Sequence, residues 1–300
     1  MNKIIYFFIF LVCGCSQFTG YDIAFLRAPA NHSYEPHDIY LLDSFSLKTK
    51  QLTSTPLDEN CPAWASNGEM LIYSAGVEKP YFRKLFLVDT EGTNNRQLTF
   101  GESDDIHPAW SRDGKKIAFA SSRLGNHSIF VMNANGKNIN KITSNDYTDY
   151  FPAWSPDGKQ IAFSSNRPFD EDNTYFDYLG SNIFIMNEDG SNIIPITADA
   201  YSNSNPDWSP DGKFIAFNSG RSGSSNIYLY SLENKKVAQL TNSPSINGVP
   251  KWSPDGKFIF FNSDRDNVTQ IFSIYKINVD SKEITRLTNS FNDVCPDPRP

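Results

Sequence analysis

Short apolar runs, bounded by Gly, Pro, Asn and Asp, recur along most of this chain. One set of four such runs covers residues 152–155, 159–164, 182–187 and 193–197. The first two are joined by Ser-Pro-Asp-Gly, which favours a tight turn because Pro fixes φ and Gly accepts positive φ. Runs of this length between turn residues predict β-strands. Outside the extreme N-terminus, no segment has the i, i+3, i+4 apolar spacing of a sizeable amphipathic helix.

Tryptophan marks the repetition of this four-strand unit. Each Trp stands two residues after a proline, and most copies continue Ser-Pro-Asp-Gly-Lys. The five copies are Trp64, Trp110, Trp154, Trp208 and Trp252, so that about 44 to 54 residues separate neighbours. A period of this size, filled with short strands, is typical of a β-propeller in which each repeat forms one blade.

The later strands of the repeat occur six times rather than five. The fourth strand ends on Leu-Thr or Ile-Thr at Thr53, Thr99, Thr143, Thr197, Thr241 and Thr288. The missing sixth copy of the first strand is displaced to the C-terminus, where Cys295-Pro296-Asp297-Pro298 follows Thr288. We therefore predict an all-β, six-bladed propeller over residues 21–300, with four-stranded antiparallel blades. The C-terminal strand would complete the first blade and remove an exposed sheet edge; the alternative is a frayed tail.

The first 14 residues have the pattern of an export signal. Lys3 precedes an apolar run over residues 4–12, too short for a permanent membrane span, and small residues follow. Val12-Cys13-Gly14-Cys15 resembles a bacterial lipobox, which implies that Cys15 is the acylated first residue of the mature chain and that residues 15–20 form a lipidated tether. The alternative is an ordinary cleaved signal.

Two of the four cysteines remain once Cys13 and Cys15 are assigned to the signal and the lipid. Cys61 and Cys295 both directly precede a blade proline, so they hold equivalent places on neighbouring innermost strands. A disulfide between them could persist in an oxidising compartment. Two free buried thiols are the alternative.

Charge and composition exclude some partners. The formal net charge is −7, and Lys and Arg are scattered rather than clustered, which argues against nucleic acid. Aromatic residues make up 14% of the chain and fall mostly at strand positions, as expected of a core between blades. We expect a monomer.

The repeat Pro-x-Trp-Ser-Pro-Asp-Gly-Lys-x-Ile-Ala-Phe, followed by Ser-x-Arg, Ile-Phe-x-Met-Asn and Leu-Thr, resembles the TolB-type β-propeller repeat. The resemblance covers about residues 21–300. TolB carries an α/β domain before its propeller, for which this sequence leaves no room, so the chain resembles a propeller-only lipoprotein relative. This implies a non-catalytic protein on the periplasmic side of the bacterial envelope. Ser16 resembles the outer-membrane sorting choice, and the implied partner is an envelope protein or one associated with peptidoglycan.

A carboxylate or amide stands three residues before each blade proline. The six are Glu59, Asp105, Asp149, Asn203, Asn247 and Asp293. We expect them to surround one mouth of the axial channel, where clustered carboxylates focus negative potential and would bind a partner. Hydrated Ca²⁺ or a Lys/Arg-bearing peptide would suit such a mouth; no other cofactor is expected. The alternative role is capping of strand backbone amides.

Arginines stand four residues after the second-strand Phe in the four later blades. They are Arg123, Arg167, Arg221 and Arg265. We expect them on the same face as the acidic mouth. The alternative is a structural role, in which each arginine holds its loop to a neighbouring acidic or carbonyl group.

One blade contains an acidic and aromatic insertion that is not repeated elsewhere. Its candidate partner-binding residues are Phe169, Asp170, Asp172, Tyr175, Phe176 and Tyr178. Non-repeated aromatic loops on a rigid scaffold often make partner contacts. A solvated loop without function is the alternative.

Catalysis has little support in the sequence. No Gly-x-Ser-x-Gly motif occurs, and His32, His37, His107 and His127 lack metal-ligand spacing. Only His107 would lie near the mouth, and the identity of any metal ligand stays open. The alternative function is therefore a carbohydrate-active or metal-dependent propeller enzyme, of the lyase or hydrolase kind.

Overall fold

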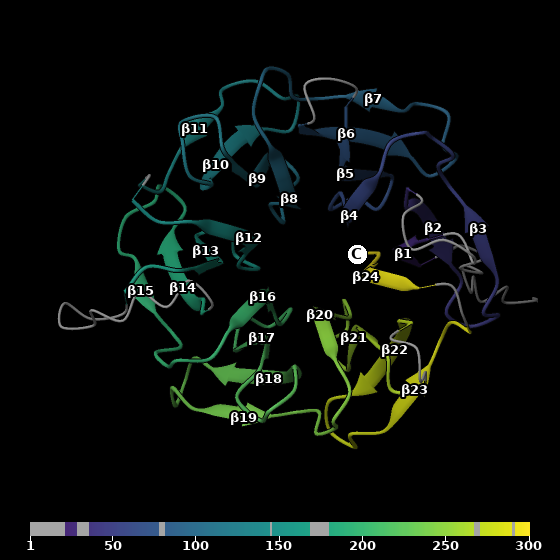
Figure 1. Ribbon diagram of the computed structural model, residues 1–300, viewed down its shortest axis with the longest axis vertical. Helices are drawn as coiled ribbons and strands as arrows, with labels where there is room; N and C mark the ends of the chain where they lie inside the picture. Colours follow the sequence, from purple (N-terminus) through teal and green to yellow (C-terminus); the bar gives the residue numbers. More distant parts are fainter. Residues whose placement is uncertain are drawn as a thin grey trace, which may run out of the picture.

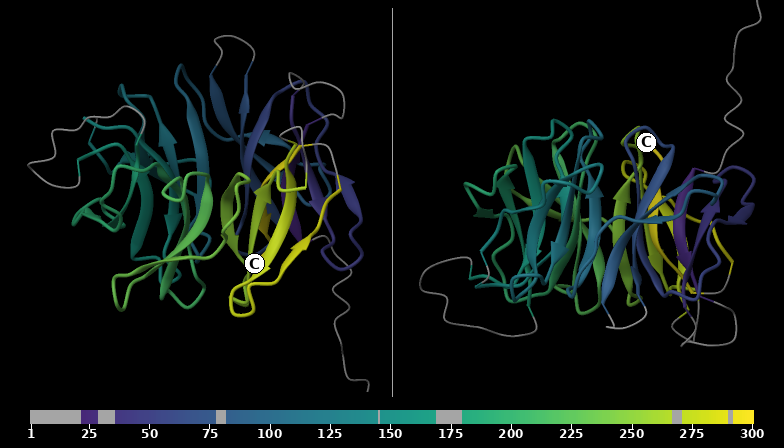
Figure 2. Two further views of the ribbon diagram at one scale, coloured as in Figure 1. Left: turned by 60° about the horizontal axis from the view of Figure 1, so that its bottom comes forward. Right: turned by 90° about the horizontal axis from the view of Figure 1, so that it is seen from above.

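The computed structural model describes residues 22–28, 36–77, 82–144, 146–168, 180–266, 271–289 and 292–300. Six four-stranded antiparallel sheets are arranged around a central axis (Figure 1). The prediction of a six-bladed propeller with four-stranded blades is confirmed. Side views show the strands running between two faces that carry the turns (Figure 2).

Each blade contributes one strand to each of four concentric layers. The innermost strands are β24 (Asp293–Pro298), β4 (Glu59–Trp64), β8 (Asp105–Trp110), β12 (Asp149–Trp154), β16 (Asn203–Trp208) and β20 (Asn247–Trp252). The second strands are β1 (Ile23–Arg27), β5 (Met70–Gly76), β9 (Lys116–Ser121), β13 (Gln160–Ser165), β17 (Phe214–Ser219) and β21 (Phe258–Ser263). The third strands are β2 (Asp38–Leu42), β6 (Arg83–Asp89), β10 (Ser128–Asn133), β14 (Asn182–Asn187), β18 (Asn226–Ser231) and β22 (Ser273–Asn278). The outer strands are β3 (Thr49–Gln51), β7 (Arg96–Gln97), β11 (Asn140–Lys141), β15 (Ile194–Pro195), β19 (Val237–Gln239) and β23 (Ile284–Arg286).

The C-terminal strand closes the ring. β24 pairs with β1 in antiparallel register, with Ile23 opposite Pro298 and Arg27 opposite Asp293. Figure 1 shows β24 next to β1 at the centre of the ring. The expected closure is therefore confirmed, and residues 295–300 are not a frayed tail.

The apolar core fills the spaces between blades. Ile72 and Leu85 of the second blade pack with Ile117 and Phe119 of the third, and all four are buried. Each Trp ends an innermost strand, and the Trp208 indole N–H donates to the Ala153 carbonyl of the preceding blade at 3.2 Å. The strand aromatics thus belong to the core, as their positions predicted.

The Asp-Gly turns between innermost and second strands are local turn structures. Gly114 has a φ of 70°, and Asp113 Oδ1 accepts hydrogen bonds from the Ser111 hydroxyl at 2.8 Å and the Lys115 amide at 3.1 Å. The same arrangement recurs at Gly158, Gly212 and Gly256. Within the described residues, no helix is long and apolar enough to span a membrane.

A β-bulge interrupts every innermost strand at the blade proline. The register between β8 and β9, for example, shifts between Ile106 and Ala109. The residue before each proline has a φ between 42° and 55°, at Cys61, His107, Phe151, Asn205, Val249 and Cys295. This left-handed conformation costs non-glycine residues roughly 1 kcal/mol. These six residues line a narrow section of the axial channel, called here the bore.

Candidate functional site

The six residues expected at an open acidic mouth are instead buried inside the blades. Each is 0 or 1% exposed, and they are Glu59, Asp105, Asp149, Asn203, Asn247 and Asp293. The expectation of an exposed ring of carboxylates differs from this placement. Their role in partner binding stays a prediction, and their burial does not favour it.

An arginine of the same blade holds the residue in five of the six cases. Arg167 donates to both carboxylate oxygens of Asp149 at 2.8 Å and to the Ser165 hydroxyl at 2.9 Å. Its guanidinium lies 5.0 Å from the centre of the Phe163 ring. The corresponding pairs are Arg27–Asp293, Arg123–Asp105, Arg221–Asn203 and Arg265–Asn247. The structural interpretation of the four later arginines is therefore confirmed.

Glu59 is the exception, because hydroxyl groups replace the arginine in the second blade. Its carboxylate accepts hydrogen bonds from the hydroxyls of Thr53 and Thr55 and from the Ile39 amide. Burial raises the pKa of Glu59 to about 7, even though these hydrogen bonds act in the opposite direction. Glu59 therefore changes its protonation near neutral pH.

No metal site emerges from the part of the chain that the structure describes. Among those residues, no group of three or more His, Cys, Asp or Glu side chains is placed to hold a metal ion. The Ca²⁺ ion expected at an open mouth stays a prediction.

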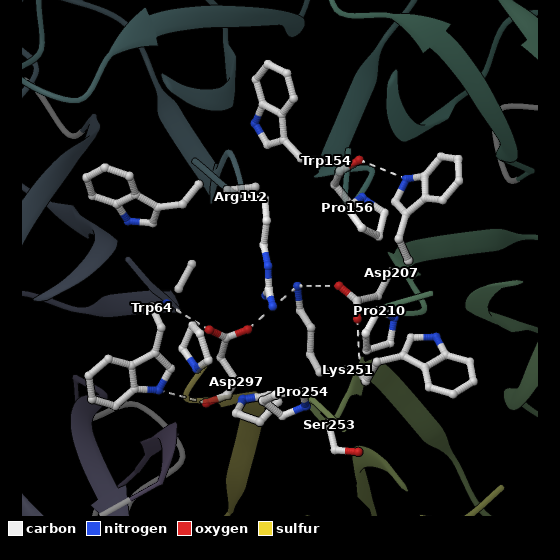
Figure 3. Close-up of a pocket in the computed structure, with 18 of the residues that line it drawn as sticks. Trp64, Arg112, Trp154, Pro156, Asp207, Pro210, Lys251, Ser253, Pro254 and Asp297 are labelled. Carbon is white, nitrogen blue, oxygen red and sulfur yellow. Dashed lines mark hydrogen bonds and ion pairs between the residues drawn. The ribbon is translucent and has the colours of Figure 1, made fainter. Parts of the chain in front are cut away.

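The opposite end of the axis opens into a different cavity, called here the vestibule. It encloses about 170 Å³ and is lined by the five tryptophans, the prolines of the turns and four charged residues. These four are Arg112, Asp207, Lys251 and Asp297 (Figure 3). Three of them occupy the position directly after the blade proline, where the other blades have Ala63, Ala109 and Ala153.

Lys251 lies between two carboxylates. Its Nζ is 3.3 Å from Asp207 Oδ1 and 3.9 Å from Asp297 Oδ1. Each Asp also accepts a backbone N–H of the next blade: that of Trp252 at 2.8 Å for Asp207, and that of Trp64 at 2.7 Å for Asp297. The carboxylates are thus fixed by the scaffold, and Lys251 is fixed by the carboxylates.

Burial shifts the pKa values of this trio. It raises the pKa of Asp297 to about 6 and also raises that of Asp207, while Lys251 opposes both shifts. Burial alone would lower the pKa of Lys251, but Asp207 and Asp297 outweigh it and raise that pKa. Lys251 is therefore charged at all physiological pH values.

Arg112 adds a second cation to the vestibule. It occupies the turn position where three other blades have Pro156, Pro210 and Pro254, and it is exposed. Its guanidinium points to the centre of the cavity, beside the Lys251 amine (Figure 3). Within the described residues Arg112 has no ion-pair partner, so its charge is available to a ligand.

His107 lies in the bore. Its ring stacks on Phe151 with 3.8 Å between ring centres, and its Nδ1 is buried without a hydrogen-bond partner among the described residues. Burial lowers the pKa of His107 to about 3, which keeps the ring neutral. His127 and His107 both contact Tyr150, whereas His37 pairs with Asp58.

The remaining sequence candidates divide into two groups. Cys61 and Cys295 lie in the bore with their Sγ atoms 3.3 Å apart. Cys15, His32 and the six candidate residues of the insertion lie outside the described residues.

The family model of the TolB beta propeller domain matches residues 101–171 and 172–297. The chain belongs to this family. No curated protein matches the sequence.

Solved structures share the TolB-like fold. A protein assigned as TolB from Agrobacterium tumefaciens is 20% identical with a TM-score of 0.73, over 92% of this chain and 91% of that one. TolB from Acinetobacter baumannii is 20% identical with a TM-score of 0.76, over 93% of this chain and 67% of that one. Oligogalacturonate lyase from Vibrio parahaemolyticus is 16% identical with a TM-score of 0.55, over 90% and 82%. At these identities the likeness shows the fold alone.

The vestibule residues were not singled out from the sequence. The signal was present in the repeat, because Arg112, Asp207, Lys251 and Asp297 replace the Ala or Pro that other blades have at the same position. Comparing the blades position by position, rather than searching for shared residues, would have found them.

The buried arginine pairs generate a stability prediction with a natural control. Asp149→Ala should lower the free energy of unfolding by about 3 kcal/mol, because it leaves Arg167 buried without its partner. Asp149→Asn should stay within about 1 kcal/mol of the wild type, since Asn203 and Asn247 already fill this position. Denaturant unfolding of the two variants measures both values. Equal losses would show that the charge, rather than the hydrogen-bonded shape, is what Arg167 requires.

A second prediction concerns pH. The raised pKa of Glu59 means that the folded state holds a proton that the unfolded state releases above about pH 4.5. Protonated Glu59 therefore contributes its full stabilisation of the folded state below pH 4.5. This stabilisation is lost as the pH rises through about 7. The unfolding free energy of the wild type relative to Glu59→Gln should therefore fall by about 3 kcal/mol between pH 4.5 and 7.5. A difference that is constant with pH would contradict the shift. Taking the difference cancels the other titrating groups.

Proposed function

We propose that this TolB-like propeller is a non-catalytic envelope lipoprotein that binds a protein or cell-wall-associated partner through the vestibule. The observation that carries the proposal is the concentration there of charged side chains that most blades lack at the same position. In a repeat protein, a residue shared by all blades serves the scaffold that all blades share. Charged departures from the repeat that meet in one cavity are instead typical of a binding site.

The vestibule has the chemistry of a peptide-binding site. Tryptophan and proline side chains form its walls. The Arg112 guanidinium, which has no ion-pair partner among the described residues, supplies a charge at its centre. Because Lys251 is already held by Asp207 and Asp297, Arg112 is the cation that would gain most from an anionic partner. The preferred partner segment therefore carries a carboxylate with apolar neighbours.

The location rests on the sequence and on the family. The export signal and the lipobox-like Val12-Cys13-Gly14-Cys15 support an anchor at Cys15, and Ser16 supports the outer membrane. Membership in the TolB propeller family supports the periplasmic side of the envelope. The protein would act as a monomer tethered by its N-terminal lipid, with the insertion at residues 169–178 as a second candidate contact.

The enzymatic alternative has support only at the level of fold. The chain is 16% identical in sequence to oligogalacturonate lyase, and at this identity the likeness concerns the fold. His107, the histidine that would have to act, is half-buried in the bore, and its lowered pKa keeps the ring neutral. Partner binding is therefore the better supported function.

Replacing Arg112 tests the vestibule. Arg112→Pro introduces the residue that three other blades have at this turn, and the Arg112 amide makes no hydrogen bond within the described structure. The fold should therefore survive. Tagged protein should capture from detergent-solubilised envelopes a partner whose yield drops roughly 3- to 10-fold in the variant, as expected for loss of one ion pair. Quantitative mass spectrometry measures the yield.

Lys115→Gln is the matched control, because it removes one positive charge from the same turn outside the vestibule. It should leave the yield unchanged. If the two variants capture every envelope protein equally well, the vestibule is not the binding site.

The anchor is tested separately. Cys15→Ala should abolish incorporation of labelled palmitate and release the protein into the soluble fraction, or leave unprocessed precursor. Persistent labelling of that variant would show that another residue carries the lipid.

A further inference from the structure

We propose that Cys61 and Cys295 form an intramolecular disulfide that locks the closed ring. The bond would join β24, the last strand, to β4, the innermost strand of the second blade. This contact between β24 and β4 is called here the closure seam. The proposal concerns a covalent modification of the scaffold and does not depend on which partner the vestibule binds.

The two thiols are already in contact. Their Sγ atoms are 3.3 Å apart, and both side chains leave the backbone from the same bulge position, with φ of 42° and 52°. A disulfide bond is about 2.05 Å long, so the sulfurs need to approach by about 1.3 Å. Rotation about the side-chain bonds of the two cysteines can move their sulfurs by this much.

Other contacts hold the closure seam in place on the vestibule side of the sulfurs. The Trp64 amide donates to Asp297 Oδ2 at 2.7 Å, and its indole N–H donates to the Asp297 carbonyl at 3.0 Å. The Arg299 guanidinium lies 5.2 Å from the centre of the Trp64 ring. β24 and β4 therefore keep their relative position whether or not the bond forms, which presents the thiols to each other.

The pair occurs where a covalent bond has most to add. The other five innermost strands continue directly into the second strand of their own blade, whereas β24 is joined to the first blade only by hydrogen bonds and packing. The bond would connect residues 234 positions apart. A crosslink over so long a segment restricts the unfolded chain strongly.

Cys61 is the better nucleophile of the two. Its contact with Cys295 lowers the pKa of the Cys61 thiol, and the charges of Lys251 and Arg83 act in the same direction. Both cysteines are partly exposed and line the bore, which gives an oxidant access.

The reaction is thiol–disulfide exchange with a disulfide oxidant. The Cys61 thiolate attacks one sulfur of the oxidant, and the other sulfur leaves as a thiolate. Cys295 then loses its proton to solvent and attacks Cys61 Sγ, which releases the second thiolate. The two cysteines together lose two protons and two electrons, and the oxidant's disulfide is reduced to two thiols. In the cell, the supply of oxidant rests on the proposed export.

The test uses the full chain, prepared under reducing conditions and then divided between oxidised glutathione and dithiothreitol. Free thiols are alkylated after denaturation, and peptides are mapped without reduction. We expect a Cys61–Cys295 linked peptide as the main species only in the oxidised sample. The oxidised protein should melt roughly 5–10 °C above the reduced protein.

Cys61→Ser and Cys295→Ser are matched variants that keep Cys13 and Cys15. Each should abolish the redox-dependent shift in melting temperature. If a variant fails to fold, the wild-type comparison still decides the question. Full alkylation of both thiols after oxidant treatment would overturn the proposal, as would thiols shielded by a stoichiometric bound metal ion instead of a bond. Loss of partner binding in Arg112→Pro leaves this outcome unaffected.

Discussion

The pairing of β24 with β1 is the interaction on which the rest of the structure depends. Every blade buries its apolar faces against two neighbours, so the core is complete only if the sixth blade meets a complete first blade. Without β24, β1 would present an unpaired edge, and the Trp64 indole would lose its carbonyl acceptor. The bore and the vestibule need the same pairing, because each is formed by residues from all six innermost strands.

The scaffold contains two kinds of polar group, which differ in whether they recur from blade to blade. The arginine pairs, such as Arg167 with Asp149, recur in blade after blade and satisfy buried polar atoms at the start of the innermost strands. The vestibule instead contains charged side chains that most blades lack at the same position. Asp207, Lys251 and Asp297 form an ion-paired group on one half of the ring, while Ala63, Ala109 and Ala153 leave uncharged positions on the other half. This asymmetry gives a nearly symmetric ring a defined orientation for a ligand.

Most of the fold could be predicted from the sequence, because the Pro-x-Trp motif and the Leu-Thr strand ends mark strands and turns that recur from blade to blade. Ring closure followed from the same count. The exposure of Asp149 and its equivalents could not be predicted, since strand position says which end a residue occupies but not whether its side chain turns into the blade. Lys251 and Arg112 were missed for a different reason: their importance lies in a cavity formed by strands of several blades.

The bulge before each blade proline has a consequence for how the channel can vary. Cysteine, histidine, phenylalanine, asparagine and valine all occupy the same left-handed backbone site in the bore. The six blades thus show five different residue types in one and the same backbone conformation within a single molecule. Since the same bulge and the same positive φ occur with all of these side chains, the backbone conformation does not depend on one residue type. The width and polarity of the channel can therefore be altered residue by residue while the propeller around it stays the same.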